Sequence, residues 1–275
     1  MNFSKLSPFF IFIFSFSFHA LAQKSPRPES FKILNSYLEA HSNIDTKEFF
    51  WKNAKTEHHF ISSTRNSDPN SIENCKLYLG KAQTITFGDW ADIFPESKNM
   101  INEEFKNKLE KLMKPIENES QLAKDYYKRL RPFKISENSF KPCVYGIFKE
   151  ELLQSPRYLS FPSTHTVEAR SAALYLSFLT NHDKVDNKEE FLKLSYPILS
   201  TGAKMGHYRV LAGHHFPTDV MAGEELTDFY FCEAFETALL EENVTRTECH
   251  KILAFLRIKG GIKAISQKEK WPYQY

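Results

Sequence analysis

The stretch "SFPSTHTVEARSAALYL", residues 160–176, joins a helix-start signal to a run of apolar residues. Pro162 and Ser163 are residue types that favour the beginning of a helix. Apolar side chains then recur at the spacing of one helix face, at Ala172, Leu174, Tyr175, Phe178 and Leu179. The stretch therefore predicts a helix that begins just after Ser163.

The rest of the chain repeats this helical periodicity and contains few alternating, strand-like patterns. A second apolar stripe comprises Ile101, Phe105, Leu109 and Leu112. Further helices are predicted near residues 28–40, 70–82, 118–130, 188–206, 217–241 and 247–258. Helices of this kind bury their apolar faces against one another, so the predicted fold class is all-α, a helical bundle.

The helix start at Ser163 also has a chemical meaning. The first backbone N–H groups of a helix lack intrahelical partners and, together with the helix dipole, can bind an anion. Ser163 can cap the helix and add its hydroxyl, and His165 lies in the first turn beside any bound anion. Taken alone, the block fits an ordinary capped helix with an exposed histidine better than an anion site.

A basic block precedes this helix, with the sequence "KDYYKRLRP" at residues 124–132. On a helix, seven residues make nearly two turns, so Lys124 and Arg131 are expected to project from one face. Pro132 disfavours continuation of the helix beyond Arg131. By itself the block fits a basic surface face, and Lys128 and Arg129 are interpreted as supporting or surface groups.

A third block follows the helix, with the sequence "HYRVLAGHHFPTDV" at residues 207–220. Pro217 suits the first turn of a helix, and a spacing of four residues would bring Asp219 to the face of His215. A carboxylate that accepts one ring N–H fixes the tautomer of a histidine and leaves its other nitrogen free as a nucleophile. Arg209 lies six residues before this histidine.

Two alternatives compete within the third block. His214 could replace His215, but only His215 has an aspartate four residues further on. A zinc site is also conceivable, but no further ligand is evident and the spacing is not that of an HExxH motif. We therefore expect no metal. Considered together, the three blocks can surround one tetrahedral dianion with cations and helix-start amides, while His165 and His215 approach it from opposite sides.

The patterns KxxxxxxRP, PSxH and RxxxxxHxxxD, in this order over residues 124–219, resemble the three-part signature of the phosphatidic acid phosphatase type 2 superfamily. Its soluble exported branch comprises the bacterial class A nonspecific acid phosphatases, and vanadium-dependent haloperoxidases share its pocket. The resemblance implies the helical bundle of these enzymes, hydrolysis of phosphate monoesters through a phosphohistidine intermediate, and no cofactor. The alternatives are a vanadate-dependent haloperoxidase and a catalytically silent phosphate-binding protein of the same fold.

The resemblance also assigns roles to residues. His215 corresponds to the nucleophile, Asp219 to the acid that orients it, and His165 to the acid that protonates the leaving oxygen. The substrate-binding positions correspond to Lys124, Arg131, Ser163, Thr164 and Arg209. Thr164 replaces the usual glycine of this signature and Tyr208 replaces a common serine, and these departures bear on subclass and substrate.

The N-terminus, "MNFSKLSPFFIFIFSFSFHALAQKS", has a lysine, an apolar run and a small-residue cleavage pattern. This is typical of a signal peptide, assigned to residues 1–22, and the apolar run is short and broken by serines for a membrane anchor. The remainder, residues 23–275, is predicted to form a single domain in the periplasm or outside the cell. No later stretch approaches the ~20 apolar residues of a bilayer span, so no stable membrane insertion is expected.

Charge and cysteine content limit the partners. The chain has 36 basic and 34 acidic residues, a balance that predicts no nucleic-acid partner. The resemblance implies a small-molecule phosphate ester as the substrate. A homo-oligomer is possible. The chain has four cysteines, Cys75, Cys143, Cys232 and Cys249. In an oxidising compartment they predict one or two disulfides, and three complete pairings are open. The alternative is that they are buried free thiols.

Overall fold

The computed structural model describes residues 29, 32–35, 89–135, 143 and 158–257, and within these residues there are helices and no strand. This confirms the predicted all-α fold class. The described elements are α4 (Trp90–Ile93), the 3₁₀ helix η1 (Pro95–Met100), α5 (Glu103–Tyr127), α6 (Pro132–Ile135), α8 (Thr164–Asn181), the 3₁₀ helix η2 (His182–Lys184), α9 (Lys188–Leu211), α10 (Pro217–Ala234), α11 (Glu236–Glu241) and α12 (Arg246–Phe255).

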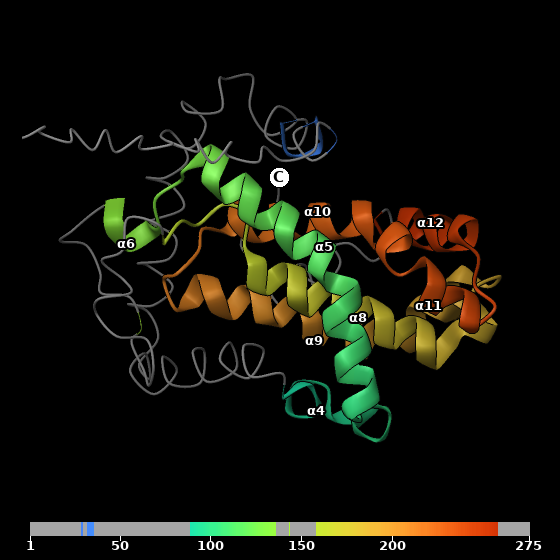
Figure 1. The fold of residues 1–275 in the computed structure, drawn as a ribbon. Helices are drawn as coiled ribbons and strands as arrows, with labels where there is room; N and C mark the ends of the chain where they lie inside the picture. Colours follow the sequence, from blue (N-terminus) through green and yellow to red (C-terminus); the bar gives the residue numbers. More distant parts are fainter. Residues whose placement is uncertain (1–28, 30–31, 36–88, 136–142, 144–157, 258–275) are drawn as a thin grey trace, which may run out of the picture.

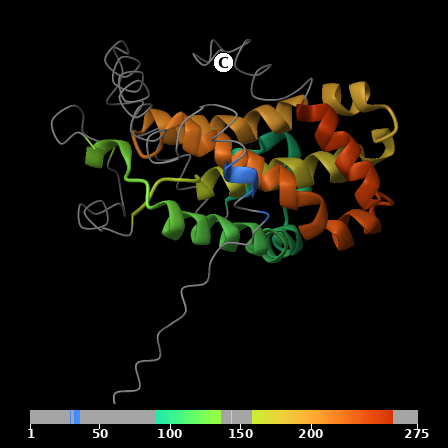
Figure 2. The same ribbon diagram turned by 90° about the horizontal axis from the view of Figure 1, so that it is seen from above.

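Helix α8 is the centre of the bundle and contacts α5, α9 and α10. In Figure 1, α5 crosses α8 obliquely, and in Figure 2 α8 and α10 lie between α9 and α5. A helix covered on several sides needs small or apolar side chains on several faces. The buried residues of α8 accordingly extend beyond the predicted stripe and include Val167, Ala169, Ala173 and Leu176.

The close packing of α9 on α8 depends on a glycine. A Cβ atom at Gly202 would lie 2.7 Å from the Cβ atom of Ala173 and 3.0 Å from the carbonyl oxygen of Ala169. These separations are shorter than normal van der Waals contacts. Gly202 therefore lets the backbones of the two helices approach each other.

Helix α5 unites two segments that the sequence analysis treats separately, the stripe at residues 101–112 and the helix near 118–130. Asn102 caps its start by accepting a hydrogen bond of 2.8 Å from the backbone N–H of Phe105. Pro115 lies inside the helix on its exposed side, where water can solvate a carbonyl left without an intrahelical partner. The helix ends at Tyr127, and Lys128 follows with a left-handed φ of 50°.

The other predicted helices differ from the structure in their boundaries. Helix α9 continues to Leu211, and the helix predicted over 217–241 is divided at Phe235 into α10 and α11. The helix near 247–258 corresponds to α12. The helix predicted near 70–82, most of that near 28–40 and the signal peptide predicted at 1–22 lie outside the described residues.

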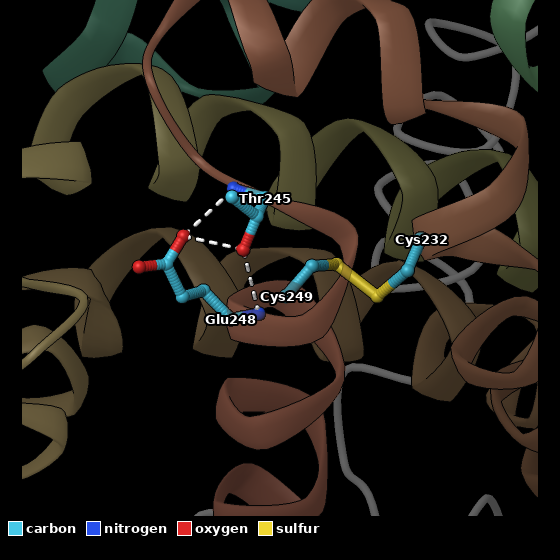
Figure 3. The surroundings of a disulfide bond; sticks show 4 residues. All are labelled: Cys232, Thr245, Glu248 and Cys249. Atoms are coloured by element: carbon cyan, nitrogen blue, oxygen red, sulfur yellow. Dashed lines mark hydrogen bonds between the residues drawn. A yellow bond between two sulfur atoms is a disulfide. The ribbon is translucent and has the colours of Figure 1, made fainter.

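A disulfide joins α10 to α12 at the end of the bundle away from the α8 start (Figures 1 and 3). It links Cys232 to Cys249, and α12 begins beside it with a capping box in which Thr245 and Glu248 exchange hydrogen bonds. Cys143 is also disulfide-bonded, and Cys75 lies outside the described residues. The predicted disulfide content is thus confirmed for the described cysteines.

None of the described helices is long and apolar enough to cross a membrane.

Candidate active site

The start of α8 is fixed against the start of α10. Ser163 caps α8 as predicted, because its hydroxyl accepts a hydrogen bond of 3.4 Å from the N–H of Thr166. The N–H of Ser163 donates to the backbone carbonyl of Asp219 at 2.8 Å. A Cβ atom at Gly223 would lie 2.7 Å from the carbonyl oxygen of Ser163, so only glycine permits this approach of α10.

Lys124 and Arg131 meet in a different way from the one predicted. Lys124 is buried in the last turn of α5, where its ammonium donates to the carbonyl oxygens of Ser160 and Pro162. Because α5 ends at Tyr127, Arg131 lies outside the helix, and the prediction that both side chains project from one helix face is wrong. The turn at Lys128 brings Arg131 back toward the site instead.

The guanidinium of Arg131 is buried among backbone and ring partners. It donates to the carbonyl oxygens of Tyr158 at 3.3 Å and His214 at 2.7 Å. Its Nη1 atom also lies 2.9 Å from Nε2 of His215, and the guanidinium stacks over the ring of Tyr158 at 3.6 Å. Stacking and several fixed acceptors leave the guanidinium little freedom to change its orientation.

These contacts determine the tautomer of His215. A guanidinium can only donate, so Nε2 of His215 accepts from Arg131 and the ring proton lies on Nδ1. Nδ1 is 3.5 Å from Oδ2 of Asp219, and both residues are buried. The prediction that a shared helix face brings them together is wrong, because His215 precedes Pro217, the first residue of α10. The loop carries the ring back to the carboxylate.

The two adjacent histidines have different surroundings. Nε2 of His214 donates to the backbone carbonyl of Cys143 at 2.8 Å, so its Nδ1 accepts from the hydroxyl of Tyr158 at 3.2 Å. Both ring nitrogens of His214 therefore bind structural groups, whereas His215 lies between Arg131 and Asp219. The geometry favours His215 over His214 as the reactive ring.

Lys124, Arg131 and Arg209, which we call the cationic cluster, act together on the two histidines. Arg209 is buried in the last turn of α9. Burial, followed by the charges of this cluster, holds the pKa of both His165 and His215 well below the ordinary value. Burial and then Arg131 lower the pKa of Lys124 to about 7, and burial lowers that of Arg131 to about 10. Three buried cations beside two neutral imidazoles favour the binding of an anion.

Thr164 and Glu168 line the same end of α8. The Thr164 hydroxyl lies 3.0 Å from that of Ser120 on α5, a link that the usual glycine could not make. Glu168, one turn further along, is a half-buried acid whose Oε2 atom is buried, and the sequence analysis missed it inside an apolar helix. Burial and then Glu117 raise its pKa to about 8, so its carboxyl is protonated at neutral pH.

Arg129 is a supporting group of the site, the first of the two interpretations that the sequence left open, and it is not a surface group. It is buried, and its Nη1 donates to Oδ1 of Asp219 at 2.7 Å and to the hydroxyl of Thr218 at 2.6 Å. Its guanidinium also lies over the ring of Phe216 at 4.0 Å. The only sequence signal for this role is that Arg129 belongs to the block between Lys124 and Arg131.

Comparison with known protein families gives one match. The model of the PAP2 superfamily matches residues 117–226, a range that contains all three sequence blocks and all the site residues described above. This match supports the superfamily, whose members are phosphatases and phosphoesterases. No curated protein matches the chain. Among the residues that the structure describes, no three histidine, cysteine or acidic side chains gather in a group that could hold a metal ion.

Proposed function

We propose that this protein is an exported, metal-independent phosphomonoesterase of the acid phosphatase type, similar to the soluble bacterial class A enzymes. The observation that most directly supports this proposal is the setting of His215. Its Nε2 faces Arg131 at 2.9 Å, and its Nδ1 faces Asp219 at 3.5 Å. The ring therefore presents an electron pair on the side of the cationic cluster, where Arg131 donates to it, and a proton on the side of the carboxylate.

The phosphoryl group is the part of the substrate that these residues recognise. A phosphate dianion would offset the excess positive charge of Lys124, Arg131 and Arg209, and the N–H groups at the α8 start would add hydrogen bonds. Phosphoryl transfer depends mainly on positioning and on stabilising the equatorial oxygens, both of which this arrangement can supply. These groups account for recognition of the phosphoryl end alone, and the substrate class that we propose is a small-molecule phosphate ester.

The reaction proceeds in two steps. In the first, the electron pair of Nε2 of His215 forms a bond to phosphorus, the ester P–O bond breaks, and the leaving oxygen takes a proton from His165. Asp219 stabilises the positive ring that results. In the second, water attacks phosphorus while His165 accepts its proton, and the P–N bond breaks. The products are an alcohol and inorganic phosphate, and both histidines return to their initial states.

The charge of the cationic cluster explains why activity should lie on the acidic side. His215 must be neutral, and its lowered pKa keeps it so in mildly acidic solution. His165 must be protonated. Burial and then the cations lower its pKa in the free protein, and a bound dianion opposes the contribution of the cations. As pH rises, His165 in the complex loses its proton and Lys124, whose pKa is about 7, loses its charge. Both changes reduce turnover or binding above neutral pH.

Export is supported by the N-terminal sequence and by the Cys232–Cys249 disulfide, because disulfides form and persist in oxidising compartments. Expression of the full-length chain in a bacterial host tests this part of the proposal. Recovery of the protein from the periplasm or medium, with an N-terminus near residue 23, is the expected result. Retention of the intact chain in the cytoplasm would contradict it.

The activity is tested with protein purified from this expression and an aryl phosphate substrate across the acidic and neutral pH range. Hydrolysis that resists EDTA and is inhibited by vanadate is expected. His215→Ala should abolish turnover while phosphate binding remains measurable, and His214→Ala is the matched control, expected to retain turnover. Bromination in the presence of vanadate without phosphatase activity would favour the haloperoxidase, and phosphate binding without either activity would favour the silent binding protein.

A further inference from the structure

We propose that Arg129 is a positioning residue for the nucleophile, acting through Asp219, and this inference rests on the function proposed above. Asp219 is fully buried, and Arg129 is 4% exposed. Arg129 lies on the opposite side of the carboxylate from His215, since it binds Oδ1 whereas the histidine faces Oδ2. The described contacts of its side chain are to Asp219, Thr218 and Phe216.

The first step concerns the orientation of the carboxylate. Nη1 of Arg129 donates to Oδ1 at 2.7 Å, and the backbone N–H of Phe216 donates to Oδ2 at 2.8 Å. With one strong donor on each oxygen, the carboxylate group cannot rotate without breaking a bond. Oδ2 is thereby kept 3.5 Å from Nδ1 of His215, on the side where the Arg131 contact leaves the ring proton.

The second step concerns charge. A buried carboxylate is stable as an anion only when a partner compensates its charge. Arg129 supplies this compensation, so Asp219 can accept the Nδ1–H group without withdrawing the proton from the ring. If Arg129 were removed, the uncompensated carboxylate would raise the pKa of His215, and more of the nucleophile would be protonated at acidic pH.

The third step concerns what fixes Arg129 itself. Its backbone carbonyl accepts from the N–H of Ser160 at 2.9 Å and from the hydroxyl of Ser160 at 3.2 Å. Its side chain binds Thr218 and stacks over Phe216 at the start of α10. Arg129 thus joins the segment that carries Arg131, the segment that leads into α8 and the start of α10, where all three sequence blocks meet.

These steps predict a specific kinetic effect. Replacement of groups that orient metal-binding histidines reduces activity by roughly 10- to 100-fold, and by analogy Arg129→Met should lower kcat by about this factor. The Michaelis constant and the inhibition constant of phosphate should change little, since the cationic cluster is intact. Arg129→Lys retains a charge and should recover part of the loss. The acidic limb of the kcat/KM profile should move to higher pH in Arg129→Met, because a cation near His215 is lost.

A second buried arginine provides the matched control. Arg170 on α8 binds Asp228 on α10 through two hydrogen bonds of 2.9 and 3.2 Å, and the catalytic scheme gives it no role. Arg170→Met also removes the arginine that hydrogen-bonds a buried aspartate, although Arg257 remains 3.6 Å from Asp228, so it should lower the thermal stability as well. Its kcat and pH profile should match those of the wild type. An equal loss of kcat in both variants would overturn the proposal.

A double-mutant cycle tests whether Arg129 acts through Asp219. Because Asp219→Asn removes the group that Arg129 orients, Arg129→Met should cost little further activity in that background. Fully additive losses would contradict the proposal.

A second readout does not depend on turnover. ¹⁵N NMR of histidine-labelled protein should show the Nδ1–H tautomer of His215 in the wild type and a mixture of tautomers or a raised pKa of His215 in Arg129→Met. Identical His215 signals in both proteins would overturn the inference, whereas failure of the wild type to hydrolyse phosphate esters would overturn only the proposed function.

Discussion

Replacement of Gly223 by alanine should damage the site without altering any group that takes part in the chemistry. The added Cβ atom would lie 2.7 Å from the carbonyl oxygen of Ser163 and 3.1 Å from Cβ of Thr166. A carbon and an oxygen that are not bonded normally stay ~3.3 Å apart, so the α8 start must shift by roughly half an ångström or more. The Ser163 carbonyl accepts from Thr166 and Val167, so the shift is transmitted to the first turn of α8, where the proposed phosphate-binding positions Ser163 and Thr164 lie.

The magnitude follows from two effects. Overpacking of this kind costs about 1–3 kcal/mol of folding free energy. Misplacement of a binding group by up to ~1 Å costs up to ~100-fold in rate, so a loss of roughly 10- to 100-fold in kcat/KM is expected for Gly223→Ala. Thermal unfolding and steady-state hydrolysis of an aryl phosphate measure the two effects separately.

Gly202→Ala is the matched control, because its Cβ atom would meet Ala173 at 2.7 Å and the Ala169 carbonyl at 3.0 Å, further along α8. It should lower the melting temperature by a similar amount while kcat/KM stays within about threefold of wild type, since its strain lies away from the reacting groups. If Gly223→Ala were destabilised and yet kept wild-type kcat/KM, the α8 start would have no role in binding phosphate.

Three further predictions concern single groups. Sulfate, a dianion that does not titrate near neutral pH, should inhibit the wild type less strongly as pH rises through about 7, because Lys124 loses its charge there. In Lys124→Arg the inhibition constant of sulfate should not change over this range. If the variant kept the pH dependence of the wild type, the assignment to Lys124 would be contradicted. The pKa of Glu168 rises on folding from 4.5 to about 8, so the folded protein favours the protonated carboxyl. The resulting contribution to the free energy of unfolding is complete below pH 4.5 and is lost as pH rises to about 8. Glu168→Gln should flatten the dependence of unfolding free energy on pH in this window, and an unchanged slope would show that another group is responsible. Replacing Cys232 and Cys249 together by alanine should cost about 3 kcal/mol of folding free energy, because the bridge closes a short loop. The value of kcat should not change, because the bridge lies away from the cationic cluster. A large loss of kcat in folded protein would show that the disulfide also affects the site.

The fold class could be predicted, and the candidate site residues could be selected, because each depends on a local or ordered pattern. Helical periodicity is visible in a window of residues, as at Phe105 and Leu109, and both residues are buried in α5. The proline and serine before Thr164 mark a helix start that the structure contains. The three blocks gave Lys124, Arg131, His165, Arg209, His215 and Asp219, and the charges of this group interact in the folded chain.

The local geometry could not be predicted, because it depends on tertiary contacts. A seven-residue spacing places two side chains on one face only if the helix persists, and the left-handed conformation at Lys128 ends α5 before Arg131 is reached. Arg129 contacts Asp219 across 90 residues of sequence, and no periodicity reports such a pair. Glu168 is an acid in helix α8, and the environment of its carboxyl becomes apparent only when α5 packs on that helix. Sequence spacing thus identifies chemical groups, whereas tertiary packing sets their orientation and charge.

The central claim is that the phosphoryl group is transferred to Nε2 of His215, and direct identification of the intermediate tests it. The protein is mixed rapidly with an aryl phosphate, quenched in alkali to preserve phosphohistidine, digested and analysed by fragmentation mass spectrometry, which distinguishes His215 from the adjacent His214. We expect the phosphoryl group on His215 in the wild type and in His214→Ala, and none in His215→Ala. A phosphoryl group on His214 or on any other residue, or steady hydrolysis by His215→Ala, would contradict the account.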